Sequence, residues 1–280
     1  MSENNIAIVT GANKGLGFAI VKGLCKNFKG TVYLTSRNED RGKRACQELQ
    51  NLGYTPQYHQ LDVTDEKSIL NLCSFLKSRK IDLLINNAGV LFLKDSKESK
   101  INQAEQTLLI NFFAVVNLTE AILPFMNDHG TILNISSSSG HLSRIPSEKL
   151  RREISDPNLS LTDLKNLMTK YIDSVKSNRE ISDGWGDSPY VVSKVGLTAY
   201  TFILNRRLKE RGILVNCLHP GYVMSDMTRG AGTVSPEQAA QVALKLALTP
   251  ETGGLFVWHN GTPVPWDGPD PRGYIDKKPV

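Results

Sequence analysis

The stretch TGANKGLG, residues 10–17, decides the fold of this 280-residue chain. It follows the apolar run IAIVT at 6–10 and leads into an amphipathic stretch at 15–27. Its glycines, at 11, 15 and 17, permit a tight turn, close approach of the backbone to a phosphate and close packing of helix on strand. The start of the helix then offers unpaired N–H groups to a pyrophosphate. The pattern predicts a strand, turn and helix that bind a dinucleotide.

The same alternation of strand and helix continues along the chain. Apolar, β-branched runs predict further strands at 31–35, 57–61, 81–86, 131–136, 213–218 and 254–258. Amphipathic stretches predict helices at 39–51, 65–78, 101–124, 188–210 and 235–248. Continuously apolar strands are typical of a parallel sheet that is covered by helices on both faces. We therefore expect an α/β fold with a doubly wound parallel sheet of about seven strands, a Rossmann fold.

Two segments depart from this alternation. Residues 141–187 are polar and charged, and within them the spacing of leucines predicts an amphipathic helix at 161–176. We interpret this segment as a helical insertion into a single domain that spans 1–260. The tail, 261–280, holds five prolines and three glycines and is expected to be irregular. It either shapes the substrate cleft or has no role, and the sequence favours no role.

Composition narrows the classes of function. Hydrophobic residues make up 40% and charged residues 22% of the chain, as in globular proteins. The net charge of +5 is scattered, which suits an anionic small ligand better than nucleic acid. We see no membrane-spanning run and no export signal at the start of the sequence. The four cysteines form no CxxC pair and no HExxH occurs, so we expect no metal site and a reducing, cytoplasmic location.

The end of the second predicted strand indicates which dinucleotide binds. An acidic residue there would accept hydrogen bonds from the adenosine ribose and favour NAD. The sequence instead reads LTSR at 34–37, and the guanidinium of Arg37 can pair with a 2′-phosphate. Lys14 can add a second positive charge. These residues predict NADP(H), unless Arg37 is only an exposed loop arginine.

A serine run and a tyrosine–lysine pair suggest the chemistry. Four serines, 136–139, follow the fifth predicted strand, and Tyr190 and Lys194 begin a helix. Residues four apart share one helix face, so the phenol and the ammonium lie together. A free phenol has a pKa of about 10, and a nearby positive charge lowers that pKa toward neutrality. The pair therefore indicates a general acid or base.

Taken together, these motifs resemble those of the classical short-chain dehydrogenases/reductases over about residues 5–258. The likeness is strongest to the monomeric NADPH-dependent carbonyl reductases, because of the NKG turn, the LTSR strand end and the long segment between serine and tyrosine. The matching motifs are TGANKGLG, Leu61-Asp62-Val63, Asn86-Asn87-Ala88-Gly89, Asn111, the serine run, YVVSK at 190–194 and Pro220-Gly221-Tyr222-Val223.

The resemblance implies a role for each matching residue. Ser137 would hydrogen-bond the substrate carbonyl, with Ser136 and Ser138 as alternatives, and Tyr190 would be the general acid. Lys194 would bind the nicotinamide ribose and lower the tyrosine pKa, and Asn111 would hold a helix kink and a water. The remaining cofactor contacts would come from Thr10, Gly11, Asn13, Lys14, Gly15, Leu16, Gly17, Arg37, Asp62, Val63, Asn87, Ala88, Gly89, Pro220, Gly221, Val223 and Ser225.

The sequence indicates the substrate and the oligomeric state less directly than it indicates the cofactor. Trp185, Tyr222, Val90, Leu91 and Phe92 neighbour the cofactor motifs and are candidates to line a cleft for apolar carbonyl compounds. Trp185 is equally explained as packing for the insertion. Many relatives form tetramers through the helices that carry the asparagine and the tyrosine. Because the insertion should cover that surface, we expect a monomer.

Three functions are consistent with these residues. The first is NADPH-dependent reduction of quinones, aldehydes and ketones. The second is reduction of one specialised ketone, such as a terpenoid, alkaloid, steroid or prostaglandin. The third, from another class, is a non-catalytic regulator that binds NADP(H). Because serine, tyrosine, lysine and asparagine are all present, the sequence favours an enzyme.

Overall fold

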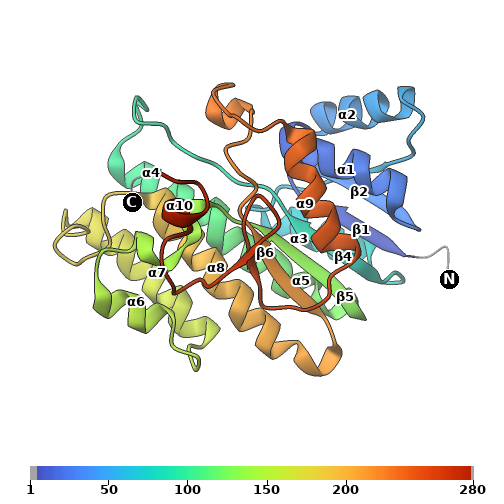
Figure 1. Cartoon of the computed structure of the whole chain (residues 1–280). Coiled ribbons are helices and arrows are strands. Elements are labelled where there is room, and N and C mark those ends of the chain that lie inside the picture. Colours follow the sequence, from blue (N-terminus) through green and yellow to red (C-terminus); the bar gives the residue numbers. More distant parts are fainter. Residues whose placement is uncertain (1–4, 279–280) are drawn as a thin grey trace.

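The computed structural model describes residues 5–278. The predictions that concern residues 1–4 and 279–280 lie outside the described residues. One sheet runs through the molecule (Figure 1), with the strand order β3-β2-β1-β4-β5-β6-β7-β8. The strands are β1 Ile6–Val9, β2 Thr31–Ser36, β3 Gln57–Gln60, β4 Ile81–Asn86, β5 Met126–Ile135, β6 Leu214–Leu218, β7 Phe256–Val257 and β8 Pro263–Val264. All neighbours pair in parallel except β7 and β8. The doubly wound fold is confirmed.

Helices cover both faces of the sheet and divide the core into two clusters. One face packs against α1 Gly15–Asn27, α2 Glu39–Asn51 and α9 Pro236–Leu248. The other face packs against α3 Glu66–Phe75, α4 Lys100–Leu108, α5 Ala114–Ile122 and α8 Pro189–Arg207. The central strands β1, β4 and β6 are mostly apolar because both of their sides are buried, which is why their sequences do not alternate.

Local sequence signals set where these helices begin. The side chains of Asn38, Asp65 and Ser188 accept hydrogen bonds from the first turns of α2, α3 and α8. Ser235 and Gln238 form a reciprocal capping box at the start of α9. Each cap satisfies a backbone donor that the helix itself leaves unpaired.

The insertion is a packed helical unit. The sequence predicts a helix at 161–176, and α7 spans Leu161–Lys176; a shorter helix, α6 Glu148–Ile154, was not predicted. Leu164 and Met168 of α7 are fully buried in the core cluster that contains α8. Lys100 at the start of α4 pairs with buried Glu180 of the insertion. The insertion therefore covers the α4 and α8 surface, as expected.

The C-terminal tail departs from expectation. We expected irregular chain, but β8 adds an eighth, antiparallel strand, and a helical turn, α10 Pro271–Tyr274, follows it. Figure 1 shows the tail folding back over the molecule rather than extending from it. Trp266 is only 8% exposed and packs against Phe202 of α8. Long-range packing, and not local periodicity, holds these short elements in place.

The helical run Lys100–Phe125 corrects one further expectation. It is long and apolar enough to cross a membrane by length and composition, although the sequence analysis found no such run. It includes α4, a π-helical turn at Leu109–Phe113 and α5. Within its most apolar window, 56% is buried inside the protein. Packing in the core of an α/β domain accounts for its apolarity.

Candidate active site

The glycine-rich turn between β1 and α1 has the close contacts that only glycine permits. Gly11 has a φ of +60°, and a Cβ on it would lie 2.9 Å from the Cα of Ala88. A Cβ on Gly17 would lie 2.5 Å from the amide nitrogen of Asn87. Thr10 Oγ1 accepts hydrogen bonds from the backbone N–H groups of Asn87 and Ala88, each at 3.0 Å. The turn is thereby fixed against the end of β4.

The start of α1 suits an anionic ligand. Within residues 5–278, no side chain caps this helix, and its first turn holds no acidic residue. Its first N–H groups and the positive end of the helix dipole face the cleft that Gly15, Leu16 and Gly17 line. The turn therefore fits a pyrophosphate, and a dinucleotide cofactor would bind here.

The residues expected to bind the adenosine end lie together at the same cleft. Arg37, at the end of β2, is exposed, and among the described residues no side chain accepts a hydrogen bond from its guanidinium. Asp62 Oδ1 accepts from both the N–H and the hydroxyl of Thr64, at 2.9 and 2.7 Å. Lys14 forms an ion pair with Asp226. Arg37 thus remains available to an anion.

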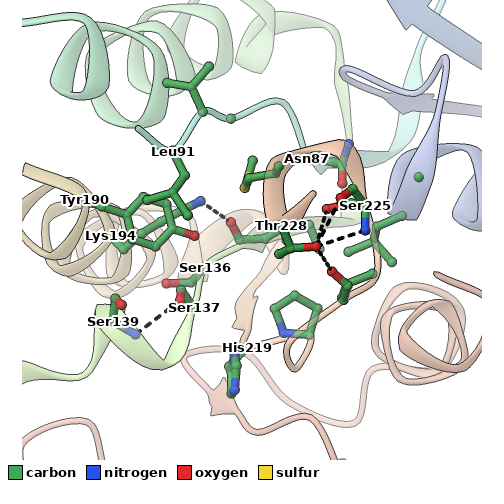
Figure 2. A pocket seen from close by; sticks show the side chains of 18 of the residues that line it. Asn87, Leu91, Ser136, Ser137, Ser139, Tyr190, Lys194, His219, Ser225 and Thr228 are labelled. Carbon is green, nitrogen blue, oxygen red and sulfur yellow. Dashed lines mark hydrogen bonds between the residues drawn. The ribbon is translucent and has the colours of Figure 1, made fainter. Parts of the chain in front are cut away.

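Helix α8 and the end of β5 bring the candidate catalytic residues together. Tyr190 and Lys194 project from the first two turns of α8 into the cleft, and Tyr190 faces Ser137, as Figure 2 shows. The ammonium nitrogen of Lys194 lies 5.8 Å from the centre of the Tyr190 ring and donates a 2.8 Å hydrogen bond to the carbonyl of Ile135. This arrangement matches the pair predicted from the i, i+4 spacing.

The four serines differ in their partners. Ser137 hydrogen-bonds Tyr190 and also accepts a 3.2 Å hydrogen bond from the N–H of Ser139. Ser136 is buried and shares a 2.9 Å hydrogen bond with the hydroxyl of Thr198. Of these two neighbours, Ser137 is the serine placed to meet a substrate beside Tyr190, while Ser136 belongs to the core.

The surroundings shift the pKa values of both catalytic candidates. Desolvation by the protein raises the pKa of Tyr190 above its usual value of 10, against a smaller lowering by Ser137. Burial lowers the pKa of Lys194 from 10.5 to about 8. The sequence analysis expected a lowered tyrosine pKa. The structure instead favours a protonated phenol, the form that a general acid requires.

Asn111 lies behind the wall of the cleft and holds the segment that follows β4 in place. Its side chain is fully buried in the π-helical turn, so the expected helix irregularity is present. The amide donates to the carbonyl of Val90 at 2.9 Å and to the hydroxyl of Ser193 at 3.1 Å, and its oxygen accepts from the N–H of Val90 at 2.8 Å. Asn111 thereby fixes the chain after β4; the bound water stays a prediction.

A cleft of about 1220 Å³ joins these parts. Of the predicted residues, it is lined by Gly11, Asn13, Lys14, Gly15, Leu16, Gly17, Arg37, Asp62, Val63, Asn87, Ala88, Gly89, Ser136, Ser137, Ser138, Tyr190, Lys194, Pro220, Gly221, Tyr222, Val223 and Ser225. Thr10 and Asn111 lie behind its wall. Figure 2 places Tyr190 and Ser137 at one side of this cleft and Asn87 and Ser225 at the other. The geometry therefore accommodates a cofactor and a substrate side by side.

The prediction of Trp185 as a substrate residue is wrong. Trp185 is 3% exposed, does not line the cleft and packs edge-to-face on Tyr171 of α7, with 5.7 Å between ring centres. It is packing for the insertion, the alternative already considered. Phe92 also lies outside the cleft, whereas Val90 and Leu91 line it.

Sequence reasoning missed a second group of cleft residues. Arg144 follows the serine run, and Arg272, Ile275, Asp276 and Lys278 come from the tail, which was expected to have no role. The signal in the sequence was a large aromatic residue in the tail, Trp266, because such a residue tends to be buried. Within residues 5–278, no group of three or more His, Cys, Asp or Glu side chains could hold a metal ion.

The fold and this site define a nucleotide-dependent oxidoreductase, and the chain belongs to the short-chain dehydrogenase family, whose model matches residues 5–147. It is 42% identical to carbonyl reductase [NADPH] 3 of Mus musculus over 257 residues, which are 89% of this chain and 92% of that protein. Carbonyl reductase [NADPH] 1 of Sus scrofa is 38% identical, with 89% of each chain covered. Among solved structures, salutaridine reductase from Papaver somniferum has a TM-score of 0.83 at 30% identity, covering 90% of this chain and 99% of that one.

Proposed function

We propose that this protein reduces carbonyl compounds, namely quinones, aldehydes and ketones, with NADPH as the hydride donor. The observation that carries the proposal is the grouping of Ser137, Tyr190 and Lys194 at one cleft with the glycine-rich turn. The similarity to carbonyl reductases [NADPH] 1 and 3 over nine-tenths of the chain supports the same activity.

The residues divide the chemistry among them. The bound nicotinamide cofactor supplies the hydride. Ser137 donates a hydrogen bond to the substrate carbonyl oxygen, where negative charge develops, and the phenol of Tyr190 gives that oxygen a proton. Because the pKa of Tyr190 is raised, the phenol holds its proton at neutral pH until the oxygen becomes basic. Lys194 places a positive charge beside the phenol and favours the phenolate that proton transfer leaves behind.

Arg37 supports NADP(H) over NAD(H). Its guanidinium lines the cleft at the end of β2, without a side-chain acceptor among residues 5–278, where a planar fork can pair with a 2′-phosphate. The carbonyl reductases to which this chain is similar are named as NADPH-dependent enzymes, which supports the same cofactor here. Lys14 adds a second cation once it leaves Asp226.

We also propose that the protein is a monomer and that it works in the reducing environment of the cytoplasm. The insertion packs over α4 and α8, the surface through which tetramers of related enzymes would form. All four cysteines are free thiols, and Cys46 and Cys217 are buried. Thiols of this kind suit a compartment without oxidising conditions.

A second candidate is reduction of one specialised ketone. It is favoured by the structural similarity to salutaridine reductase and to menthone neomenthol reductase from Mentha piperita, the latter with a TM-score of 0.78 at 25% identity. Substrate breadth separates the candidates: a wide panel with similar kcat/KM supports the first, and one dominant substrate supports the second.

The test is NADPH oxidation at 340 nm with quinones, aromatic aldehydes and ketones, repeated with NADH and with Tyr190→Phe. We expect NADPH to be strongly preferred and the variant to lose activity by roughly 100-fold or more while still binding NADPH. Tight NADPH binding without turnover on any carbonyl would contradict the proposal and favour the non-catalytic regulator.

A further inference from the structure

The C-terminal tail is fastened to the segment that follows the catalytic serine. The indole N–H of Trp266 donates a 2.7 Å hydrogen bond to the carbonyl of Gly140, and the N–H of Leu142 donates to the carbonyl of Trp266 at 3.2 Å. His141 Nε2 lies 3.0 Å from the carbonyl of Pro265 and donates to it. These contacts join β8 and the following loop to the chain just beyond Ser137, so the tail forms part of the cleft.

Two carboxylates of the tail already have partners. Asp270 accepts a hydrogen bond from Ser143 at 2.9 Å and a charged one from Arg272 at 2.7 Å. Asp276 accepts from the indole of Trp258 and from His259, each at 2.9 Å. These bonds fix α10 and the chain after it against the cleft, and they occupy oxygens of both acids.

Unlike these two carboxylates, the guanidinium of Arg144 has no partner of opposite charge in direct contact within the described chain. It is half-buried and lines the cleft with Ser137, Ser139 and Tyr190. Among residues 5–278, no carboxylate forms an ion pair with it and no oxygen accepts a hydrogen bond from its side chain. Burial and the nearby charge of Arg272 lower the pKa of Arg144, while the charge of Asp270 acts the other way; a guanidinium stays charged at neutral pH in any case.

An unpaired, half-buried guanidinium beside a catalytic group is costly unless an anion meets it there. A planar fork of N–H donors matches a carboxylate in a bidentate arrangement. The charge of Asp270 acts on Arg144 from a distance, but the oxygens of Asp270 are held by Arg272 and Ser143, so an anion in direct contact with Arg144 has to come from outside the protein. The cofactor's phosphates do not supply it, because the pyrophosphate turn and Arg37 belong to α1 and β2, whereas Arg144 and α10 adjoin the serine segment.

We infer that Arg144, framed by the docked tail, is a specificity-determining residue that binds the carboxylate of carbonyl substrates. The inference rests on the proposed function and deepens it. The preferred substrates are aldehydes and ketones that carry an apolar body and a carboxylate away from the carbonyl. Ser137 and Tyr190 hold the carbonyl, while Arg144 holds the other end of the same molecule.

The test compares ω-(4-formylphenyl)alkanoates, which carry a free carboxylate on chains of increasing length, with their methyl esters, in the intact protein with NADPH. For the wild type we expect the acids to have the higher kcat/KM. Arg144→Met should lower kcat/KM for the acids by roughly 10-fold or more, in line with loss of a charge-assisted hydrogen bond, and should affect the esters far less than the acids. Arg144→Lys should restore part of the loss. Arg152→Met, which removes an exposed arginine of α6, is the matched control and should change neither.

Binding of 4-phenylbutanoate, which has no carbonyl to reduce, gives a second readout. Titration in the presence of NADPH should show Kd raised roughly 10-fold in Arg144→Met. An unchanged Kd, or equal losses for acids and esters, overturns the inference. If the wild type reduces neither acids nor esters, the proposed function fails, and the Kd comparison still decides whether Arg144 binds carboxylates.

Discussion

Lys14, on the glycine-rich turn, forms a 2.5 Å ion pair with Asp226 in the loop that follows β6. The two residues are 212 positions apart and lie across the cofactor end of the cleft. Lys14 is also a predicted contact of the 2′-phosphate, so it has two competing anionic partners. Both side chains are more than half exposed, and an exposed pair of this kind contributes little stability.

Asp226→Asn should therefore strengthen NADPH binding. Removal of the carboxylate frees Lys14 and lowers the negative charge near the phosphate, and we expect KM for NADPH to fall by roughly threefold, most clearly at low salt. Steady-state kinetics at two ionic strengths measures the effect. Asp95→Asn is the control, because it releases Arg229 of the same loop without freeing Lys14. Equal effects of the two variants would attribute the change to loop movement.

Arg37 should decide between the two nicotinamide cofactors. Arg37→Met removes the guanidinium proposed to pair with the 2′-phosphate, and KM for NADPH should rise by roughly 10-fold to 100-fold. KM for NADH should stay the same, because NADH has no phosphate there. Arg44→Met, on the exposed face of α2, controls for a general change in charge. A parallel rise for NADH would show that Arg37 supports the fold and not cofactor choice.

The features that were predictable from sequence are those that depend on local periodicity or on close backbone contact. The helix at 161–176 was found from its leucine spacing because one face of α7 is buried. The glycine turn was found because Gly11 and Gly17 leave no space for a side chain. Tyr190 and Lys194 were paired because four residues make one turn of α8.

Features that depend on distant contacts could not be predicted. Strand β8 has only two residues and exists because Val264 pairs with Phe256. Arg144 enters the cleft because the tail closes one side of it, and no local pattern near residue 144 indicates this. Trp185 stands next to the cofactor motifs in sequence but turns toward Tyr171. The site's cofactor end could thus be predicted, whereas its substrate end could not.

Ser136 and Ser137 should respond differently to alanine. Ser137→Ala removes a hydrogen bond to the developing oxyanion, and kcat should fall by about 100-fold with little change in Tm. Ser136→Ala instead breaks the buried bond to Thr198, so we expect about 1 kcal/mol less stability and nearly normal kcat. Kinetics and thermal unfolding of both variants separate the roles. The opposite pattern would make Ser136 the catalytic serine.

Replacement of Lys194 should abolish activity and raise the stability of the fold. Lowering its pKa from 10.5 to about 8 corresponds to roughly 3 kcal/mol that burial of the charge costs the folded state. Lys194→Met removes this cost but leaves the carbonyl of Ile135 without its donor, a loss of about 1 kcal/mol. We therefore expect the variant to be inactive yet more stable by about 1–2 kcal/mol at pH 7.

The pH dependence of this gain tests its cause. Below about pH 8, Lys194 is protonated in both the folded and the unfolded wild type, so the full cost is present. Between about pH 8 and 10.5 the folded protein releases the proton while the unfolded chain keeps it, and the wild type becomes relatively more stable as pH rises. The advantage of Lys194→Met, measured by denaturant unfolding across this range, should shrink and then reverse. A constant difference would mean that packing, and not charge burial, separates the two proteins.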